Sequence, residues 1–521
     1  QESRETYQAP FFVDHVIRET VNLLKNEYDI TSDEAFNKIY NDGLRIYTTV
    51  NMTIQKKAEK VMADSNNFPK TTTDSSNTPQ PQGAFVLIDH SNGHIKALVG
   101  GRQHEKRLGL NRATQSYRQP GSSFKPVSVY SAAIEMGYTA ASVVDDSPVV
   151  YNSWAPENQN RRFNGLVTVR RAIENSINVV AVKILDNIGI NRGIEYAQKL
   201  GINSLITEGS RNDHNLPAMA LGGLTKGTTP LEMCSAYSTL ANKGVYIEPR
   251  AIIKIADKEG RTLIEPIQEQ RVAINEQTAF IITDMLKGVI KRGTGWRLAG
   301  FPFPAGGKTG TTDDSKDIWF IGYTPYYSGA VWIGHDEPAK MTNVAGGLQP
   351  ALIWKQVMET AHKGLSVKDF QKPNNIIGPI KVCSTSGLLP TELCEHDPRG
   401  SQVISEYFIK GTEPTDFCDI HVMEDICSES GLLTTEFCPK SDIETGIYIQ
   451  RKIPFVPAKN GRVPLDAPYE APKEYCDIHN QFSEEYPVDF ENGSSINEEN
   501  DFPDYNNDNE IYKENNYINP Q

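Results

Sequence analysis

The stretch Gln119-Pro120-Gly121-Ser122-Ser123-Phe124-Lys125-Pro126 places a serine three residues before a lysine, directly after a turn signal. The apolar run over 127–133 follows it and predicts a buried helix. A serine that opens a helix meets unpaired backbone N–H groups, and Lys125 shares its helical face. A serine hydroxyl is a poor nucleophile until a neighbouring base removes its proton, so the pair predicts a serine nucleophile beside an amine. Alone, a Ser-x-x-Lys stretch is far more often a helix cap with a solvated lysine.

A second candidate piece is Ser176-Ile177-Asn178, which lies between two predicted helices. The first of these helices is expected to end near Glu174 and the second to begin near Val179. Residues two apart do not share a helical face, so a joint role of Ser176 and Asn178 requires a loop or an extended link. The position between the helices allows such a link.

The third piece is Lys308-Thr309-Gly310-Thr311, which we expect on an edge strand. Strand alternation places the side chains of Thr309 and Thr311 on one face, and Gly310 leaves clearance for close backbone approach. A lysine with two hydroxyls can hold a carboxylate, and an edge strand can pair with an extended peptide. A nucleotide-binding loop is excluded, because its glycine five residues before Gly307 is here Pro302.

The elements around these pieces predict an α+β fold, an antiparallel sheet with helices packed on it. Two strands over 84–89 and 94–99 are joined by Ser91-Asn92-Gly93, a strong hairpin signal. Helices are expected over 168–199, 230–242 and 276–291, and strands over 318–323 and 329–333. The N-terminal region predicts helices over 11–26, 31–43 and 52–63, a strand over 44–50 and a mobile surface loop over 66–82.

Charge and composition divide the chain further. Of the net charge of −14, the last 41 residues carry −10, from eleven Asp or Glu against Lys513, which leaves −4 for the remainder. This mildly acidic body excludes a basic nucleic-acid surface, and the acidic, Asn-rich tail is expected to be disordered. The expected regions are an N-terminal adaptor over 1–82, a main domain over 83–370, two Cys-rich repeats over 375–480 and the tail over 481–521.

Together the three pieces, in this order, form the signature of the penicilloyl serine transferases. The chain resembles the transpeptidase domain of class A penicillin-binding proteins from about Phe11 to about Gly364. The resemblance lies mainly in residues 118–126, Thr294-Gly295, residues 305–312 and residues 317–325. Class A proteins also carry a membrane helix and a glycosyltransferase domain upstream. Because this chain begins at Gln1 and contains neither, we expect it to be a fragment of such a protein.

The resemblance implies a peptidoglycan DD-transpeptidase in which Ser122 attacks a D-Ala-D-Ala stem peptide and Lys125 acts as general base. Burial and the nearby cation of Lys308 would lower the pKa of Lys125. Ser176 would relay a proton to the leaving amine, and Asn178 would orient Lys125. The backbone N–H groups of Ser122 and Thr311 would form the oxyanion hole. The terminal carboxylate would be held by Lys308, Thr309, Gly310 and Thr311.

The resemblance also implies the setting: the extracytoplasmic face of the bacterial membrane, with a membrane anchor upstream. The partners implied are stem peptides, β-lactams, which acylate the same serine, and the cell-wall synthesis machinery, with no cofactor. Resolution of the acyl-enzyme by an amine, giving a cross-link, is favoured. A DD-carboxypeptidase and a non-catalytic β-lactam sensor or decoy remain alternatives. Ile177 stands where class A β-lactamases have aspartate, which argues against that class.

Six of the seven cysteines lie in an internal repeat. Residues 383–394 match residues 427–438 almost residue for residue, and each copy closes with Cys-Asp-Ile-His, at 418–421 and 476–479. One interpretation is a Cys3His metal set per copy, formed by Cys383, Cys394, Cys418 and His421 and by Cys427, Cys438, Cys476 and His479. The other is two disulfides, Cys383–Cys394 and Cys427–Cys438, which an extracytoplasmic location favours. Cys234, on an apolar helix, is expected in the core.

Overall fold

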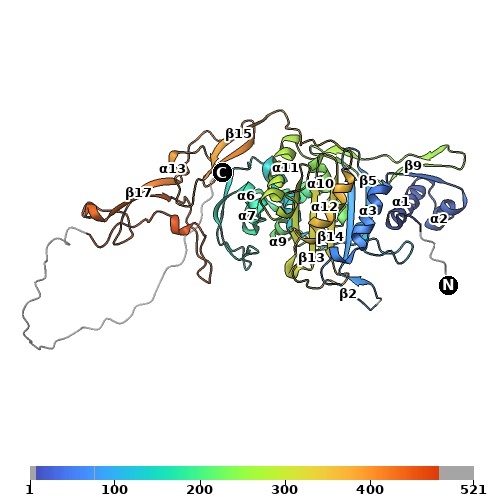
Figure 1. Ribbon diagram of the computed structural model, residues 1–521, viewed down its shortest axis with the longest axis horizontal. Helices are drawn as coiled ribbons and strands as arrows, with labels where there is room; N and C mark the ends of the chain where they lie inside the picture. The colour runs from blue at the N-terminus through green and yellow to red at the C-terminus, as the bar shows by residue number, and fades with distance from the viewer. Residues whose placement is uncertain (1–6, 76, 480–521) are drawn as a thin grey trace, which may run out of the picture. The chain divides into compact units, whose positions relative to one another are not determined.

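The computed structural model describes residues 7–75 and 77–479 (Figure 1). Packing divides the chain into two compact units. The first comprises the chain up to Glu424 together with Thr445–Ala471, and the second comprises Asp425–Glu444 and the segment from Pro472 onward. The predicted disordered tail over 481–521 lies outside the described residues. No helix in the described ranges is long and apolar enough to cross a membrane.

The centre of the first unit is an antiparallel five-stranded sheet of order β12-β13-β14-β4-β5. All of its strands except the edge strands β12 and β5 pair on both sides, and β4, β13 and β14 are almost entirely buried. Such strands bury apolar side chains on both faces, which explains runs such as Phe85-Val-Leu-Ile88. The strands are β4 (Gln82–Asp89), β5 (His94–Val99), β12 (Gly306–Thr311), β13 (Asp317–Tyr323) and β14 (Ser328–Gly334).

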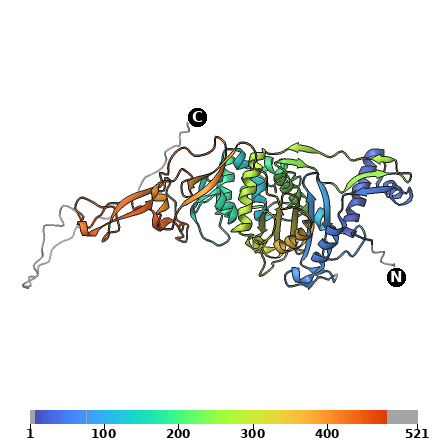
Figure 2. The same cartoon turned by 45° about the horizontal axis from the view of Figure 1, so that its top comes forward.

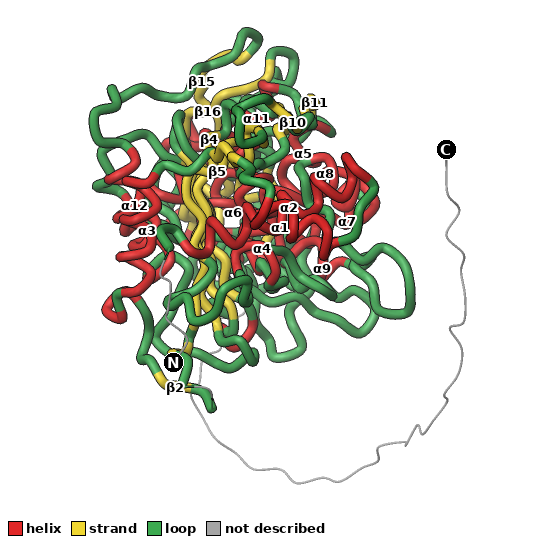
Figure 3. Tube along the Cα trace, turned by 90° about the vertical axis from the view of Figure 1, so that its right-hand side faces the viewer, coloured by secondary structure: helices red, strands yellow, loops and turns green. Residues whose placement is uncertain are grey.

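Helices cover both faces of this sheet, as Figure 3 shows, so the predicted α+β architecture is confirmed. On one face, Trp354 of α12 (Gln349–Ala361) packs edge-on against Phe320 of β13. On the other face, Tyr237 of α10 (Pro230–Ala241) packs against Tyr323, three residues further along the same strand. Odd and even positions of a strand point to opposite sides, so the two contacts mark two separate helical layers.

The helix expected after Ser122 is present but is not one regular α-helix. A 3-10 turn (Gly121–Phe124) leads into a π-helical turn (Pro126–Tyr130), and α5 (Ser131–Glu135) completes it. Pro126 has no N–H, so the α-helical bond to Ser122 cannot form, and Lys125 N–H donates to the Ser122 carbonyl instead. All of the apolar run over 127–133 is buried, as predicted.

The N-terminal elements follow the predicted pattern, with one exception. Thr31 and Glu34 form the predicted capping box at the start of α2, and α3 has the predicted bounds. The expectation of a mobile loop over 66–82 is wrong in part, because the short strands β2 and β3 pair within it. Gln82 at its end is buried, and its Oε1 atom accepts the backbone N–H of Arg102. The elements are α1 (Pro10–Tyr28), α2 (Ser32–Asn41), β1 (Arg45–Thr48), α3 (Met52–Ala63), β2 (Thr72–Thr73) and β3 (Pro79–Gln80).

The middle of the chain supplies most of the helical layer near Ser122, and it adds two strands to a small sheet that also contains β1 of the N-terminal region. In that sheet, β1 pairs with β9, which also pairs with β10. The elements are α4 (Arg112–Gln115), β6 (Val143–Asp146), β7 (Gly165–Thr168), α6 (Val169–Glu174), α7 (Asn178–Ile188), α8 (Ile190–Lys199), α9 (Leu216–Leu221), β8 (Val245–Ile247), β9 (Ile252–Ala256), β10 (Thr262–Ile264), β11 (Gln270–Val272) and α11 (Glu276–Lys291).

After α12 the chain forms a hairpin, β15 (Ile376–Cys383) with β16 (Val403–Ile409), that lies beside α11 (Figure 2). Phe280 of α11 packs edge-on against Tyr407 of β16. Arg170 of α6 donates to both carboxylate oxygens of Glu406, at 2.6 and 2.7 Å. The hairpin is therefore attached to the main helical layer by an aromatic contact and a buried ion pair. The remaining elements are α13 (Glu392–Glu395), β17 (His421–Cys427) and β18 (Ile443–Ile449).

Candidate active site

Of the two adjacent serines, Ser122 is partly accessible and Ser123 is not. Ser122 is half-buried, whereas Ser123 is fully buried and donates its hydroxyl to the Pro120 carbonyl at 2.6 Å. The Ser123 carbonyl accepts the hydroxyl of Tyr237 at 2.7 Å, which anchors the turn to α10. The turn therefore presents Ser122 to the exterior and uses Ser123 for packing.

Lys125 is fully buried, and three oxygens surround its amine. The Nζ atom donates to the Ser176 carbonyl at 2.8 Å, the Ile177 carbonyl at 3.2 Å and Asn178 Oδ1 at 2.7 Å. Burial, and next the cation of Lys308, hold the pKa of Lys125 well below its ordinary value. Three donated bonds at once require the charged amine, whereas a neutral amine donates to only two of these oxygens at a time and keeps a lone pair that can accept a proton.

Lys308 is also fully buried, and it approaches the same interhelical link from β12. Its Nζ atom donates to Ser176 Oγ at 2.8 Å and to the Thr309 carbonyl at 3.1 Å. Burial lowers the pKa of Lys308 to about 7. Ser176 thus contacts both lysines, Lys125 through its carbonyl and Lys308 through its hydroxyl. It does so with φ of 58°, a left-handed conformation that is uncommon for a residue other than glycine.

Asn178 is the first residue of α7, and its side chain is fixed at both ends. Oδ1 accepts from Lys125, and Nδ2 donates to the Glu157 carbonyl at 2.9 Å. The link between α6 and α7 spans only residues 175–177, at the place that the sequence predicts. The carbonyls of Ser176 and Ile177 and the Oδ1 atom of Asn178 all accept from Lys125 Nζ.

Asn158 supports this helix start and was not found from the sequence. Its Oδ1 atom accepts the backbone N–H groups of Asn178 and Val179, at 2.9 and 3.2 Å, so it caps α7. Its Nδ2 atom donates to both carboxylate oxygens of the fully buried Asp146, at 2.8 and 2.9 Å. Burial raises the pKa of Asp146. Asn158 lies in a loop of polar residues without periodicity, so no local pattern marks it.

The edge strand β12 lies directly against the turn that carries Ser122. A Cβ atom at Gly310 would lie 2.5 Å from the Pro120 carbonyl oxygen, which is closer than real contacts allow. Glycine at this position therefore permits the close approach that the sequence predicts. Thr309 Oγ1 shares a hydrogen bond of 2.7 Å with Thr294 Oγ1, and Thr311 is half-buried at the strand end.

The structure thus brings the three pieces of the sequence together from a helical turn, an interhelical link and an edge strand. The arrangement contains a partly accessible serine, a buried amine three residues further along with a lowered pKa, a second serine that contacts both lysines and an edge strand with two threonines. Such a set can take a proton from a hydroxyl nucleophile and hold an anionic ligand group beside it.

None of the seven cysteines takes part in the hydrogen bonds described above. All seven are in the described part of the chain, and all are free, so the disulfides favoured from the expected compartment are not formed. Cys234 is fully buried in α10 and its Sγ contacts the Ser328 carbonyl at 3.4 Å, which places it in the core as predicted. The other six gather with two histidines in two clusters.

Comparison with known proteins identifies the domain that carries the candidate site. The family model of the penicillin binding protein transpeptidase domain matches residues 83–359, and that of the penicillin-binding protein 1A C-terminal domain matches residues 372–423. Penicillin-binding protein 1A of Clostridium botulinum (strain Langeland) is 38% identical over 441 residues, covering 82% of this chain and 52% of that protein. The chain therefore spans about half the length of the curated relatives it matches.

Solved structures give the same result. Penicillin-binding protein 1A from Haemophilus influenzae has a TM-score of 0.66 at 24% identity, covering 80% of this chain and 78% of that chain, which supports the fold. The PonA1 protein from Mycobacterium tuberculosis, solved in complex with penicillin V, has a TM-score of 0.60 at 28% identity, covering 70% of this chain and 97% of that chain. The chain belongs to the penicillin-binding protein transpeptidase family and is similar to the penicillin-binding proteins 1A.

Proposed function

We propose that this chain carries a serine-type DD-transpeptidase, which cross-links peptidoglycan stem peptides through an acyl-enzyme on Ser122. The observation that carries the proposal is the position of two buried lysines on either side of Ser176, one of which lies three residues from an accessible serine. Family membership and the penicillin V complex of the related PonA1 protein support it.

In the acylation step, the neutral amine of Lys125 takes the proton of the Ser122 hydroxyl. Ser122 Oγ then forms a bond to the carbonyl carbon of the first D-Ala, and the amide bond to the terminal D-Ala breaks. The leaving nitrogen receives its proton from the Ser176 hydroxyl, which Lys308 replenishes through the hydrogen bond of 2.8 Å. The lowered pKa of Lys125 supports this role, because a protonated amine cannot accept the hydroxyl proton.

Binding of the substrate uses β12. Its free edge can pair with the extended stem peptide, and Lys308 with Thr309 and Thr311 can hold the terminal carboxylate. The backbone N–H groups of Ser122 and Thr311 are assigned to the oxyanion hole, where one such donor contributes about 3 kcal/mol. Carboxylate binding beside Lys308 favours its charged form, which in turn keeps Lys125 neutral.

The acyl-enzyme is resolved by the amine of a second stem peptide, which forms a new amide bond as the ester bond to Ser122 Oγ breaks. The amine gives its proton through Ser176 back to Lys308, and Lys125 returns its proton to Ser122. β-Lactams acylate the same hydroxyl and block it. We assign this activity to the extracytoplasmic face of a bacterial membrane, alongside other proteins of cell-wall synthesis, as the resemblance to class A penicillin-binding proteins implies. No residue of the proposed mechanism requires a metal or a cofactor.

The nucleophile is tested with fluorescent penicillin. Wild-type protein should become labelled at one site per chain, Ser122→Ala should lose the label, and Ser123→Ala should keep it as the matched control. Thermal melts of both variants establish that they are folded. Labelling that survives in folded Ser122→Ala would exclude this nucleophile.

The reaction is tested with a D-Ala-D-Ala donor peptide and a D-amino acid acceptor. An exchanged peptide identifies the transpeptidase, whereas release of D-Ala without exchange identifies a carboxypeptidase. Stoichiometric penicillin labelling with neither product would identify a sensor and refute the enzyme.

A further inference from the structure

The first cysteine cluster lies between β15, α13 and β17 of the first unit. Cys383, Cys394, Cys418 and His421 are all buried, and their Sγ and ring-nitrogen atoms lie within 4.8 Å of one another. His421 Nδ1 is 3.3 Å from Cys418 Sγ and 3.5 Å from Cys383 Sγ. A tetrahedral zinc ion with Zn–S bonds of about 2.3 Å keeps its ligand atoms about 3.5 to 3.8 Å apart. The two nitrogen–sulfur distances are therefore close to those of a tetrahedral site, and the other ligand atoms lie near enough to close around one ion.

A disulfide explains this cluster less well. Its two sulfurs would be about 2.05 Å apart, and it would leave a third thiol and an imidazole buried beside it without a function. In contrast, backbone N–H groups point at the sulfurs: Thr385 donates to Cys383 Sγ and Thr391 to Cys394 Sγ, both at 3.4 Å. Such donors stabilise the negative charge that a metal-bound thiolate carries.

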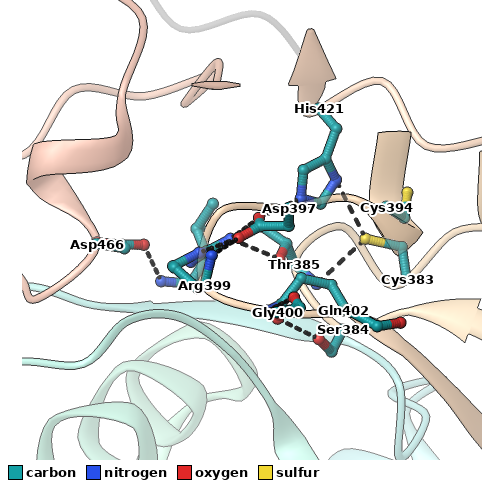
Figure 4. A network of polar contacts seen from close by, with 12 residues as sticks. Cys383, Ser384, Thr385, Cys394, Asp397, Arg399, Gly400, Gln402, His421 and Asp466 are labelled. Carbon is teal, nitrogen blue, oxygen red and sulfur yellow. Dashed lines mark hydrogen bonds and ion pairs between the residues drawn. The ribbon is translucent and has the colours of Figure 1, made fainter. Parts of the chain in front are cut away.

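The imidazole of His421 is oriented for metal binding. Its Nδ1 atom faces the sulfurs, while Nε2 lies 2.7 Å from Asp397 Oδ2 (Figure 4). Asp397 is itself held by Arg399, through Nε at 2.9 Å and Nη2 at 2.6 Å. A carboxylate on the far nitrogen fixes the tautomer and the ring orientation of a ligating histidine. The arrangement thus includes the outer partner of a metal site as well as its four ligands.

The second cluster repeats the same ligand order within the second unit. Cys427, Cys438, Cys476 and His479 again lie within 4.8 Å of one another, with His479 Nδ1 3.5 Å from both Cys427 Sγ and Cys476 Sγ. Backbone N–H groups again point at sulfur, from Thr435 to Cys438 at 3.3 Å. The buried hydrophobic cluster here consists of the three cysteines, so apolar burial alone gives this unit little stability.

We propose that each Cys3His cluster binds one Zn²⁺ ion, so that the chain holds two structural zinc sites in its C-terminal repeats. Three sulfurs and one nitrogen in a closed tetrahedral set, with no ligand position left for water, are typical of structural zinc. On binding, each set releases the three thiol protons and keeps a neutral imidazole, which leaves a net charge of −1 per site. The metal takes the place of the hydrophobic core that these small repeats lack.

The two sites differ in one residue that matters. Asp397, which orients His421, corresponds to Ser441 in the second copy, and the nearest carboxylates to His479 Nε2 are Glu429 at 3.5 Å and Asp442 at 4.0 Å. Loss of such an outer partner weakens metal binding about tenfold to a hundredfold. The first site should therefore retain its zinc longer than the second.

Metal analysis of the whole chain, purified anaerobically with a phosphine reductant, tests the sites. We expect two zinc ions per chain, one in Cys383→Ser, one in Cys427→Ser, and two in the control His396→Asn, which changes an exposed histidine beside the first cluster. If the variants fail to fold, cobalt uptake by the demetallated wild type gives the answer: two equivalents should produce tetrahedral thiolate–cobalt absorption. Reduced protein that takes up neither zinc nor cobalt overturns the proposal, as does an oxidised mass that indicates disulfides in the anaerobic preparation.

The difference between the sites is tested by release to a chelator. Wild type should lose its zinc in two phases, and Asp397→Asn should accelerate only the slower one. Acceleration of the faster phase instead would refute the assignment of Asp397 to the tighter site.

Discussion

Lys308 donates from its Nζ atom to the hydroxyl oxygen of Ser176 at 2.8 Å, which connects the edge strand of the sheet to the link between α6 and α7. In the proposed reaction this bond is the route by which a proton reaches the leaving amine. Removing the hydroxyl interrupts that route but leaves Ser122 and Lys125 in place, so the effect of the route can be measured separately.

Ser176→Ala should therefore slow penicillin acylation about 10²- to 10⁴-fold, the range of a positioned proton donor. The second-order rate constant of labelling is measured by quenching the reaction at set times and reading the labelled protein by gel fluorescence. Asn175→Ala, at the exposed neighbouring residue, is the control and should stay near wild type. An acylation rate of Ser176→Ala within threefold of wild type would contradict the proton route.

The pKa of Lys308, lowered by burial to about 7 from its ordinary 10.5, gives a pH-dependent stability. Between these two pH values the unfolded state holds a proton on Lys308 and the folded state does not. The free energy of unfolding therefore rises with pH in this window, by at most about 1.4 kcal/mol per pH unit. Below pH 7 both states are protonated and the burial cost of the charge is fully present.

Lys308→Met removes this dependence and should be more stable than wild type by an amount that is largest at pH 6 and shrinks towards pH 9. Urea unfolding at several pH values measures it. Lys291→Met, at an exposed site on α11, reports the general effect of losing a positive charge. A stability difference that grows with pH would show that Lys308 is charged in the folded protein.

Asn158 caps α7 and, through it, positions Asn178 against Lys125. Asn158→Ala should lower the free energy of unfolding by about 1 kcal/mol, as expected for a lost cap, and slow acylation. Asn158→Asp should be worse in both respects, because it places a second carboxylate against the buried Asp146. The exposed Asn160→Ala is the control. Equal effects of the two Asn158 substitutions would argue against the contact with Asp146.

Glu406 is fully buried against Arg170, and this pair attaches the C-terminal hairpin to α6. Glu406→Ala should cost less than the ~3–5 kcal/mol of a fully unpaired buried charge, because Arg170 loses its bidentate partner but keeps its contact with Asp284. The double variant Arg170→Met, Glu406→Leu should recover part of that loss. Asp369→Ala, which breaks an exposed pair with Lys287, should cost less than about 1 kcal/mol. Calorimetry or urea unfolding distinguishes these outcomes.

The sequence predicts those parts of the site that local patterns encode. The turn signal between 84–89 and 94–99 predicts the β4–β5 hairpin. The residues at 122, 125, 176, 178 and 308 are predicted because three short motifs occur together in the order of a known family. Asn158 and Asp146 are not found, since each acts only through a partner distant in the chain. The 3-10 and π turns around Pro126 are missed for another reason: periodicity reports a helix but not its pitch.

The cysteines show the same limit. Their spacing allows both disulfides and metal binding, and the expected compartment favours disulfides. Only the folded chain reveals that Nδ1 of each histidine faces the sulfurs while Asp397 holds the far nitrogen of His421. Side-chain direction of this kind depends on tertiary packing and leaves no trace in residue spacing.

Ser176 adopts a left-handed backbone conformation that favours glycine, whereas the proposed reaction requires a serine hydroxyl at this position. Glycine adopts this conformation without the penalty of about 1 kcal/mol that a Cβ atom brings, so a mutation to glycine would relax the link while removing its hydroxyl. Selection for thermal tolerance alone would favour that exchange, and selection for the proposed proton transfer would oppose it. In the proposed mechanism, the stability of the fold and the rate of the reaction therefore favour different residues at position 176.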